Sequence, residues 1–255
     1  MKRIVICLLV LAMILPCLPA AAEGGDTVTY RDMTVSRDTE YVDFGQRAIY
    51  KWDLVYDFLQ QLPNLKKVDM FGATINLKVY NKLNELFPDV EFNCLIQYGQ
   101  HRACTTDTAF STLFSGGQQL HKYEEIAMLK WCKNLYALDV GHHPIRKLDF
   151  LYDMPELRVL IVAINELTDI TPIASLKHLE YLEIFHNQIT DLSPLKDLEY
   201  LMDLDLVKNK VTDLTPVMGL KRLKRLWIYW SNYPDSPSAE TVAQLQEALP
   251  DCHID

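Results

Sequence analysis

The side chains best suited to chemistry are carboxylates and histidines in the C-terminal half of the chain. Asp203 and Asp205 alternate along one short apolar segment, and Glu183 precedes Asp205 by 22 residues. Paired carboxylates can hydrolyse glycosides when their surroundings separate their pKa values. The open face of a strand does little to shift those pKa values, so we expect no glycosidase chemistry from these residues.

The histidines are equally weak candidates for a metal site. His142 and His143 are adjacent, and neighbouring residues of a strand or turn point apart. His142 and His186 are separated by twice the 22-residue spacing, and would lie roughly 10 Å apart at about 4.8 Å per strand. One ion cannot bridge that distance, so ordinary surface histidines are expected. The sequence also contains no nucleophile elbow, phosphate loop or zinc-protease motif. We therefore predict no catalytic residue, no metal, no cofactor and no enzymatic activity.

A repeat of 22 residues organises the segment that carries these side chains. Each copy begins with L-x-x-L-x-[LVI], in which alternating apolar residues predict a short strand with one buried face. One such strand cannot cover that face alone, so the copies are expected to stack into a parallel sheet. The leucines that begin the five copies are Leu135, Leu157, Leu179, Leu201 and Leu223.

An asparagine follows three of the strands, at positions 165, 187 and 209. Its amide can bond the backbone of the turn that leaves the sheet, and a buried amide without partners would cost roughly 1–3 kcal/mol. We therefore expect a hydrogen-bonded column of asparagines. Position 143 holds histidine, so the column is expected to begin one repeat later.

The return path of each repeat carries a hydroxyl residue directly before proline. These pairs are Thr171-Pro172, Ser193-Pro194 and Thr215-Pro216. The hydroxyl is expected to cap free N–H groups, and proline fits the first turn of a helix. Few residues remain before the next repeat, so single 3₁₀ turns are predicted on the convex side. One aspartate precedes each pair, at positions 169, 191 and 213, which favours a capping or solvated role over calcium binding.

The stretch Leu179–Leu201, reading LEYLEIFHNQITDLSPLKDLEYL, resembles the repeats of the internalin family, bacterial surface and secreted leucine-rich-repeat proteins. The resemblance covers Leu135 to about Tyr229, somewhat over a third of the chain. It implies an α/β leucine-rich-repeat solenoid, a horseshoe with a parallel concave sheet and with helices and 3₁₀ turns on the convex side. It also implies protein binding, often at a host interface, without naming a partner.

Five segments are predicted along the chain. They are a signal peptide (1–22), an N-terminal extension (23–37), irregular longer leucine-rich repeats (38–134), the regular repeats (135–230) and a capping helix and strand (231–255). In the irregular segment, apolar residues with helical spacing predict longer helices around Val55, Leu83 and Leu129. Ser238 is expected to cap a last helix over 239–248 that covers the final edge, so the chain is expected to reach the end of the solenoid.

The N-terminal segment reads as a secretion signal, with Lys2 and Arg3 before an apolar run and alanines at 20–22. A retained membrane anchor is the alternative, but the run is short for a span. Cleavage would remove two positive charges from a chain of formal net charge −9, and acidic proteins suit neither nucleic acid nor anionic membranes. We predict a secreted, extracellular protein that binds no nucleic acid and does not insert into membranes after cleavage.

Cys94 and Cys104 flank a plausible hairpin turn in a chain predicted to reach an oxidising compartment. A disulfide between them and ordinary buried thiols are both open alternatives.

Function is expected on the exposed face of the sheet, whose residues alternate with the buried leucines. That face is apolar and aromatic with charged residues along its edge, the composition of an interface, unless the capping segment covers it. The predicted partner-binding residues are Val159, Ile161, Tyr181, Glu183, Phe185, Asp203, Asp205, Arg225, Trp227 and Tyr229. The predicted function is binding of a protein partner, and the alternative is a carbohydrate-binding protein that stacks sugars on the same aromatic side chains.

Overall fold

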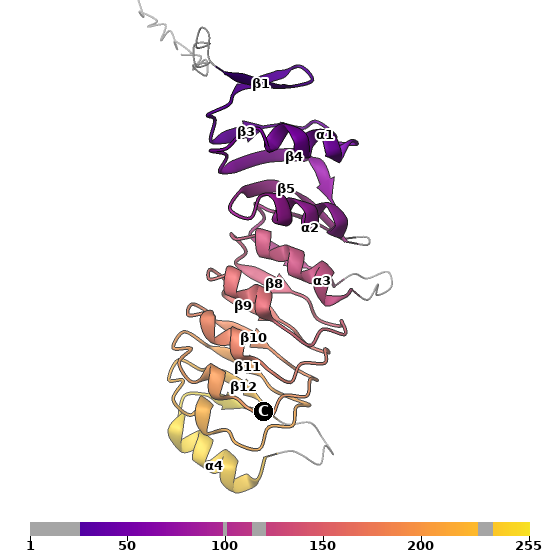
Figure 1. Cartoon of the computed structure of the whole chain (residues 1–255). Helices are drawn as coiled ribbons and strands as arrows, with labels where there is room; N and C mark the ends of the chain where they lie inside the picture. The colour runs from indigo at the N-terminus through magenta and orange to yellow at the C-terminus, as the bar shows by residue number, and fades with distance from the viewer. Residues whose placement is uncertain (1–25, 99–100, 114–120, 229–236) are drawn as a thin grey trace, which may run out of the picture.

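The computed structural model describes residues 26–98, 101–113, 121–228 and 237–255. The elements stack along one long axis in chain order, from the N-terminal strands to the C-terminal helix (Figure 1). Buried apolar side chains from Val28 to Cys252 belong to one hydrophobic cluster, so the two halves share a core. The predicted signal peptide lies outside the described residues. Within the described ranges, no helix combines the length and the apolar character needed to cross a bilayer.

Seven short strands form the larger sheet, and all of them are parallel and follow one another in chain order. They are β7 (Ala109–Ser111), β8 (Ala137–Asp139), β9 (Val159–Ile161), β10 (Tyr181–Glu183), β11 (Asp203–Asp205), β12 (Arg225–Trp227) and β13 (His253–Ile254). In the regular repeats the register places residues 22 positions apart side by side, so that Leu182 lies between Leu160 and Leu204. All three leucines are buried, which confirms the predicted repeat and its parallel sheet.

Single 3₁₀ turns return the chain, as predicted. They are η2 (Asp149–Asp153), η3 (Thr171–Ser175), η4 (Ser193–Leu195) and η5 (Thr215–Val217). In η3, Oδ1 of Asp169 accepts a hydrogen bond from the backbone N–H of Thr171 at 2.8 Å, and the aspartates of the next two repeats make the same contact. The capping role predicted for these aspartates is confirmed. The prediction that the hydroxyl before proline caps the turn is wrong, because that residue is itself the first of the turn.

The predicted column of asparagines is confirmed, and Asn187 shows its chemistry. Its Nδ2 donates to the carbonyl oxygens of Val162 and Ile184, both at 3.0 Å, and its Oδ1 accepts from the N–H of Leu167 at 3.0 Å. The other two asparagines make equivalent bonds. Each amide thus ties two neighbouring repeats together.

The column of hydrogen bonds extends one repeat further toward the N-terminus than expected, because His143 takes the place of asparagine. Its Nδ1 accepts from the backbone N–H of His121 at 3.3 Å, and its Nε2 lies 2.8 Å from the hydroxyl of Thr112. Its own backbone N–H donates to Asn165 at 3.1 Å. An imidazole therefore joins the first regular repeat to the segment before it.

A separate four-stranded sheet lies in the N-terminal half, after a hairpin of β1 (Thr27–Tyr30) and β2 (Met33–Ser36). Its strands are β3 (Tyr41–Asp43), β4 (Lys67–Ile75), β5 (Glu91–Tyr98) and β6 (His101–Cys104). The first three are parallel, but β6 pairs with β5 in the antiparallel direction. The irregular half was expected to belong to the same solenoid. It shares the core with the regular half, although its sheet ends at β6 and β7 begins the next sheet.

Helices return the chain in this half, as predicted for two of three positions. They are α1 (Trp52–Leu59), α2 (Leu77–Leu86) and α3 (Tyr123–Ile126), and α3 continues as the 3₁₀ helix η1 (Ala127–Trp131). The third expected helix is therefore a single α-helical turn.

Strand β4 also carries an irregularity between Met70 and Thr74, where a Cβ on Gly72 would lie 2.2 Å from the backbone of Gln46.

The C-terminal helix α4 (Ala239–Ala248) has the bounds expected from the sequence. Ser238 accepts a hydrogen bond from the N–H of Thr241 at 3.1 Å, which confirms its capping role. Beyond the helix, β13 adds the last strand beside β12.

The four cysteines among the described residues are all free. Cys104 lies opposite Leu95 in the β5–β6 pair, so its side chain and that of Cys94 point to opposite faces of the sheet. The structure therefore favours the alternative without a disulfide between them.

Candidate interaction surface on the parallel sheet

Two rows of side chains cross the exposed face of the larger sheet, perpendicular to the strands. The first row is Val159, Tyr181, Asp203 and Arg225, and the second is Ile161, Glu183, Asp205 and Trp227. All of these residues are at least partly exposed, whereas the leucine between the two rows on each strand is buried. We call these eight residues the sheet face. The register thus brings together eight of the ten predicted partner-binding residues.

The other two predicted residues follow the strands. Phe185 lies two residues beyond β10 and is partly exposed, with its ring centroid 5.7 Å from that of His186. The ammonium of Lys208, from the next repeat, lies 5.3 Å from the Phe185 centroid. Tyr229 lies outside the described residues, so its place on this surface stays a prediction.

Charged and aromatic groups of the sheet face contact one another both within a strand and between neighbouring strands. Arg225 forms an ion pair with Asp203, and its guanidinium carbon lies 5.3 Å from the ring centroid of Trp227. The hydroxyl of Tyr181 donates to Oε2 of Glu183 at 3.0 Å. Burial, with the charge of Glu183, raises the pKa of Tyr181 to about 12, so this phenol remains a hydrogen-bond donor at neutral pH. These contacts hold the aromatic rings in defined positions.

Asp205 is the most perturbed carboxylate of the face. Burial raises its pKa from 3.8 to about 6, and the charge of Glu183 on β10 adds to the rise. The hydrogen bond that Asp205 accepts from the Val207 N–H has the opposite effect and lowers the pKa. The expectation that an open sheet leaves the carboxylate pKa values unshifted is therefore wrong for Asp205, which lies between Glu183 and Trp227 on the adjoining strands. A cationic group placed against it would favour its charged form.

A column of left-handed backbone conformations borders the face, and sequence reasoning missed it. His142, Ile164, His186 and Lys208 recur every 22 residues with φ between 53° and 65°. This region is costly for a β-branched residue such as Ile164. Its N–H donates to the carbonyl of Phe185 at 2.8 Å, so bonding between repeats holds the turn. The available signal was the buried amide or imidazole that follows each of these positions.

Three histidines meet at the junction of the two sheets, which sequence reasoning also missed. The ring centroids of His101 and His121 are 5.1 Å apart, and those of His121 and His143 are also 5.1 Å apart. His143 is only 4% exposed, so the prediction of a surface histidine is wrong there. Burial, with the neighbouring imidazoles, lowers its pKa to about 4. Among the described residues, no set of three or more His, Cys, Asp or Glu side chains is arranged to hold a metal ion.

Comparison with known protein families supports the same architecture. Residues 155–197 match the family model for leucine-rich repeats in two copies. That match coincides with β9, β10 and the turns between them, where the register of 22 residues is regular. The fold is a leucine-rich-repeat solenoid. A search of curated proteins found no match to the chain.

Solved structures similar to the solenoid include internalins and other leucine-rich-repeat proteins. An internalin (inlF) from Listeria monocytogenes strain 4b F2365 is 21% identical with a TM-score of 0.42, over 77% of this chain and 57% of that one. Internalin C2 from the same strain is 22% identical with a TM-score of 0.43, over 87% of this chain and 85% of that one. A leucine-rich-repeat protein of Leptospira interrogans is 15% identical with a TM-score of 0.32, over 77% and 74% of the two chains. The solenoid thus spans 57% of the length of the first internalin.

Proposed function

We propose that this solenoid is a secreted protein that binds a partner protein through the sheet face and Phe185. The binding set is Val159, Ile161, Tyr181, Glu183, Phe185, Asp203, Asp205, Arg225 and Trp227, with Tyr229 as its predicted continuation. Secretion rests on the signal-like sequence of residues 1–22. The role proposed for the chain is binding, with no catalytic step.

One observation carries the proposal: apolar and aromatic side chains are aligned on the accessible side of consecutive strands. A face that only met solvent would carry charged residues at most of these positions. Instead Val159 and Tyr181 lie side by side in the first row, and Ile161 is the residue of β9 in the second row. Apolar area edged by charges is the usual composition of a protein interface.

The carboxylates add a preference for the partner's chemistry. Asp203 already has a partner in Arg225, whereas Asp205 is partly buried and lies opposite Glu183. A lysine or arginine of the partner would relieve the unfavourable charge at the Glu183–Asp205 pair. We therefore propose a partner that presents a basic side chain together with apolar ones.

Affinity capture with matched variants tests the proposal. The immobilised wild-type chain would be compared with Trp227→Ala and Phe185→Ala, and the dissociation constant of the captured protein would be measured by surface plasmon resonance. Each face variant is expected to lose about 2 kcal/mol of binding free energy, roughly 30-fold in affinity. Tyr152→Ala, which removes a 56% exposed aromatic side chain from η2, is the control and should bind like wild type.

Full affinity in both folded variants, Trp227→Ala and Phe185→Ala, would remove the sheet face and Phe185 from the function. A glycan array probed with the same variants separates the carbohydrate alternative. Sugar binding that depends on Trp227, in the absence of a captured protein, would replace protein binding as the function.

A further inference from the structure

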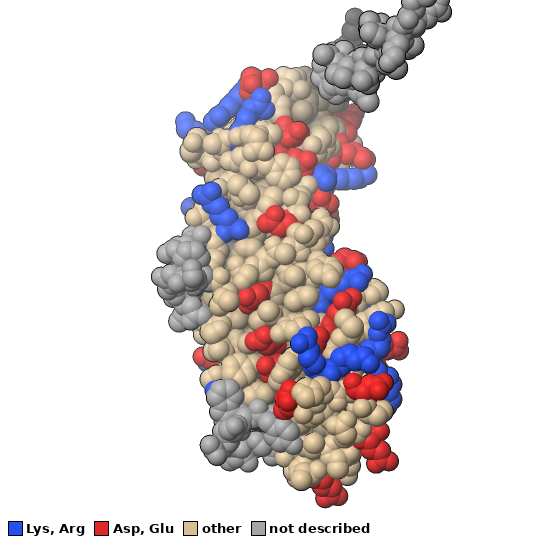
Figure 2. Space-filling view, turned by 180° about the vertical axis from the view of Figure 1, so that it is seen from behind, with Lys and Arg blue, Asp and Glu red and all other residues tan. Residues whose placement is uncertain are grey.

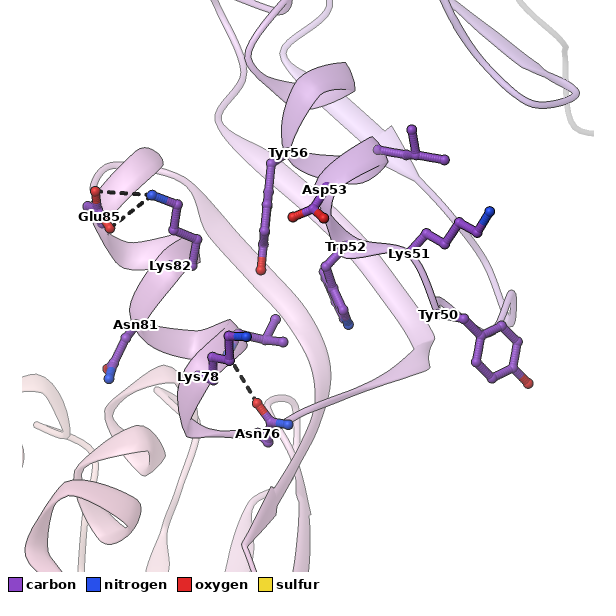
Figure 3. Close-up of a pocket in the computed structure, with 12 residues that line it drawn as sticks. Tyr50, Lys51, Trp52, Asp53, Tyr56, Asn76, Lys78, Asn81, Lys82 and Glu85 are labelled. Atoms are coloured by element: carbon purple, nitrogen blue, oxygen red, sulfur yellow. Dashed lines mark hydrogen bonds and ion pairs between the residues drawn. The ribbon is translucent and has the colours of Figure 1, made fainter.

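A groove of about 870 Å³ opens between helices α1 and α2, in the irregular half of the chain. Tyr50, Trp52 and Tyr56 line it from the side of α1, and Lys78 and Lys82 line it from α2. Figure 3 shows the rings of Trp52 and Tyr56 on the side of α1 that faces α2, with Tyr50 projecting outward at the rim. None of these residues belongs to the sheet face.

The rings of Trp52 and Tyr56 are stacked, and we call this pair the aromatic shelf. Trp52 and Tyr56 are one helical turn apart, and their ring centroids are 6.1 Å apart with an interplanar angle of 29°. Both rings pack partly against the hydrophobic core, which restricts their motion while part of each stays accessible. Tyr50 is 83% exposed and extends the aromatic surface at one end. Flat, oriented rings of this kind can stack on a flat apolar face of a ligand.

The lysines give the groove a local charge that differs from that of the whole chain, whose formal net charge is −9. Lys78 is exposed and has no ion pair within the part of the chain that the structure describes, and the same holds for Lys51 at the rim. Lys82, in contrast, pairs with Glu85 at 3.1 Å. Lys78 is thus a positive charge available to a ligand anion beside the aromatic shelf.

Polar amides flank Lys78. Oδ1 of Asn76 accepts a hydrogen bond from the N–H of Val79 at 3.1 Å, which fixes this side chain at the start of α2 and leaves its amide N–H groups to a ligand. Asn81 lies further along α2 at the edge of the groove, where Figure 3 shows its side chain directed away from Trp52 and Tyr56. Asp53 and Glu85 also line it, so an acidic ligand group is placed at the Lys78 end.

We propose that this groove binds an acidic oligosaccharide, with a sugar ring stacked on Trp52 and a carboxylate or sulfate group at Lys78. Amide donors beside an oriented aromatic shelf suit the hydroxyl groups and ring faces of sugars. Both walls of the groove are helices whose backbone groups bond internally, so neither offers a strand edge with which an extended acidic peptide could pair. The site is independent of partner binding because the two surfaces share no residue.

Calorimetry on the full chain tests the site with defined probes. Polygalacturonate hexasaccharide supplies carboxylates, heparin hexasaccharide supplies sulfates, and maltohexaose is the neutral probe. We expect at least one acidic probe to bind, the neutral probe to bind at least about tenfold more weakly, and salt to weaken the acidic complex. Lys78→Glu and Trp52→Ala should each reduce affinity by at least about tenfold. Lys196→Glu makes the same charge change at an exposed lysine of the regular half and should match wild type.

Lys78 is exposed, so its variant keeps the proposal testable if Trp52→Ala unfolds. Failure of both acidic hexasaccharides to bind, or an equal loss in Lys78→Glu and Lys196→Glu, would overturn the site. A poly-glutamate peptide that binds as tightly as the sugars and is unaffected by Trp52→Phe and Trp52→Ala would show a peptide site in its place. Because Trp227→Ala leaves this groove intact, failure here is distinguishable from failure of the proposed function.

Discussion

The two halves of the solenoid cover the same core with different return paths. In the regular half, single 3₁₀ turns bring the chain back and a buried asparagine bonds the repeats together. In the irregular half, α1 and α2 replace those turns, and an antiparallel strand closes the sheet at β6. The return paths of the irregular half contain helices, and a groove lies between α1 and α2.

Figure 2 shows the molecule from behind the view of Figure 1, with acidic and basic groups scattered over a surface that is mostly uncharged. The regular half offers the proposed partner-binding surface as two rows of side chains in register, whereas the irregular half offers a groove with lysines on one wall. One repeat architecture can therefore present two chemically different surfaces, depending on how long the return path is.

Core truncation in each half should give the largest effect. Leu182 of β10 and Leu83 of α2 are both 0% exposed. Leu182→Ala and Leu83→Ala are each expected to lower the free energy of unfolding by roughly 2–5 kcal/mol, because each opens a cavity in a packed core. Urea unfolding followed by circular dichroism should show one transition that both variants shift.

Glu180→Ala is the control for Leu182→Ala. It removes only an accessible ion pair with Arg158 and should be nearly silent. Two separate transitions, each sensitive to one leucine, would show that the halves do not share a core. A mild effect of Leu182→Ala equal to that of Glu180→Ala would contradict the repeat register.

The histidine junction should make the connection between the halves sensitive to acid. The pKa of His143 is about 4 in the folded chain, against an ordinary value of 6.5. Between these values the unfolded state binds more protons, so stability falls as the pH falls from 6.5 toward 4, by up to about 3 kcal/mol. His121 and His101 near the same ring add to the lowering of the His143 pKa, and the charge of Asp139 opposes it.

His143→Asn separates this contribution from general acid denaturation. The variant places an amide in the column without a titrating group, so it should lose less stability than wild type between pH 7 and about pH 4.5. The measurement is urea unfolding at both pH values. Equal losses in the two proteins would mean that His143 does not control the acid response.

Asp205→Asn should change the stability least, and it should raise the stability at neutral pH, where the core variants above lower it. The pKa of Asp205 is about 6 in the folded chain, against an ordinary value of 3.8. The folded state therefore binds the proton more tightly than the unfolded state, and stability is lost as the pH rises through about 6. Asparagine keeps the acceptor for the Val207 N–H and removes the charge. We expect a gain of about 1 kcal/mol at pH 7, after solvent screening, and little change at pH 4.

Thermal unfolding at the two pH values checks this expectation, with Asp203→Asn as the control. That variant weakens the pair with Arg225 and should bring no gain at pH 7. A loss of stability in Asp205→Asn at pH 7 would show that the charge at position 205 does not oppose folding. A gain in stability combined with weaker partner binding would support the role proposed for this carboxylate.

Most of the regular half could be predicted because its signals are local and repeated. Leucines spaced by 22 residues determine which face is buried, and a short return path with proline leaves room only for 3₁₀ turns. The hydroxyl residues before proline misled the capping prediction, because both they and the preceding aspartates have capping chemistry. Only the geometry of the turn shows that Asp169 reaches the free N–H.

The sequence by itself determined the repeat, its register and the set of residues that share the sheet face, because those follow from the alternation of side chains along each strand. Tertiary structure decided the rest. The pKa of Asp205, the meeting of His101, His121 and His143, and the groove beside Trp52 all depend on contacts between segments far apart in the chain. Burial and distance between such segments set these properties, and neither quantity is encoded in the spacing of residues along one repeat.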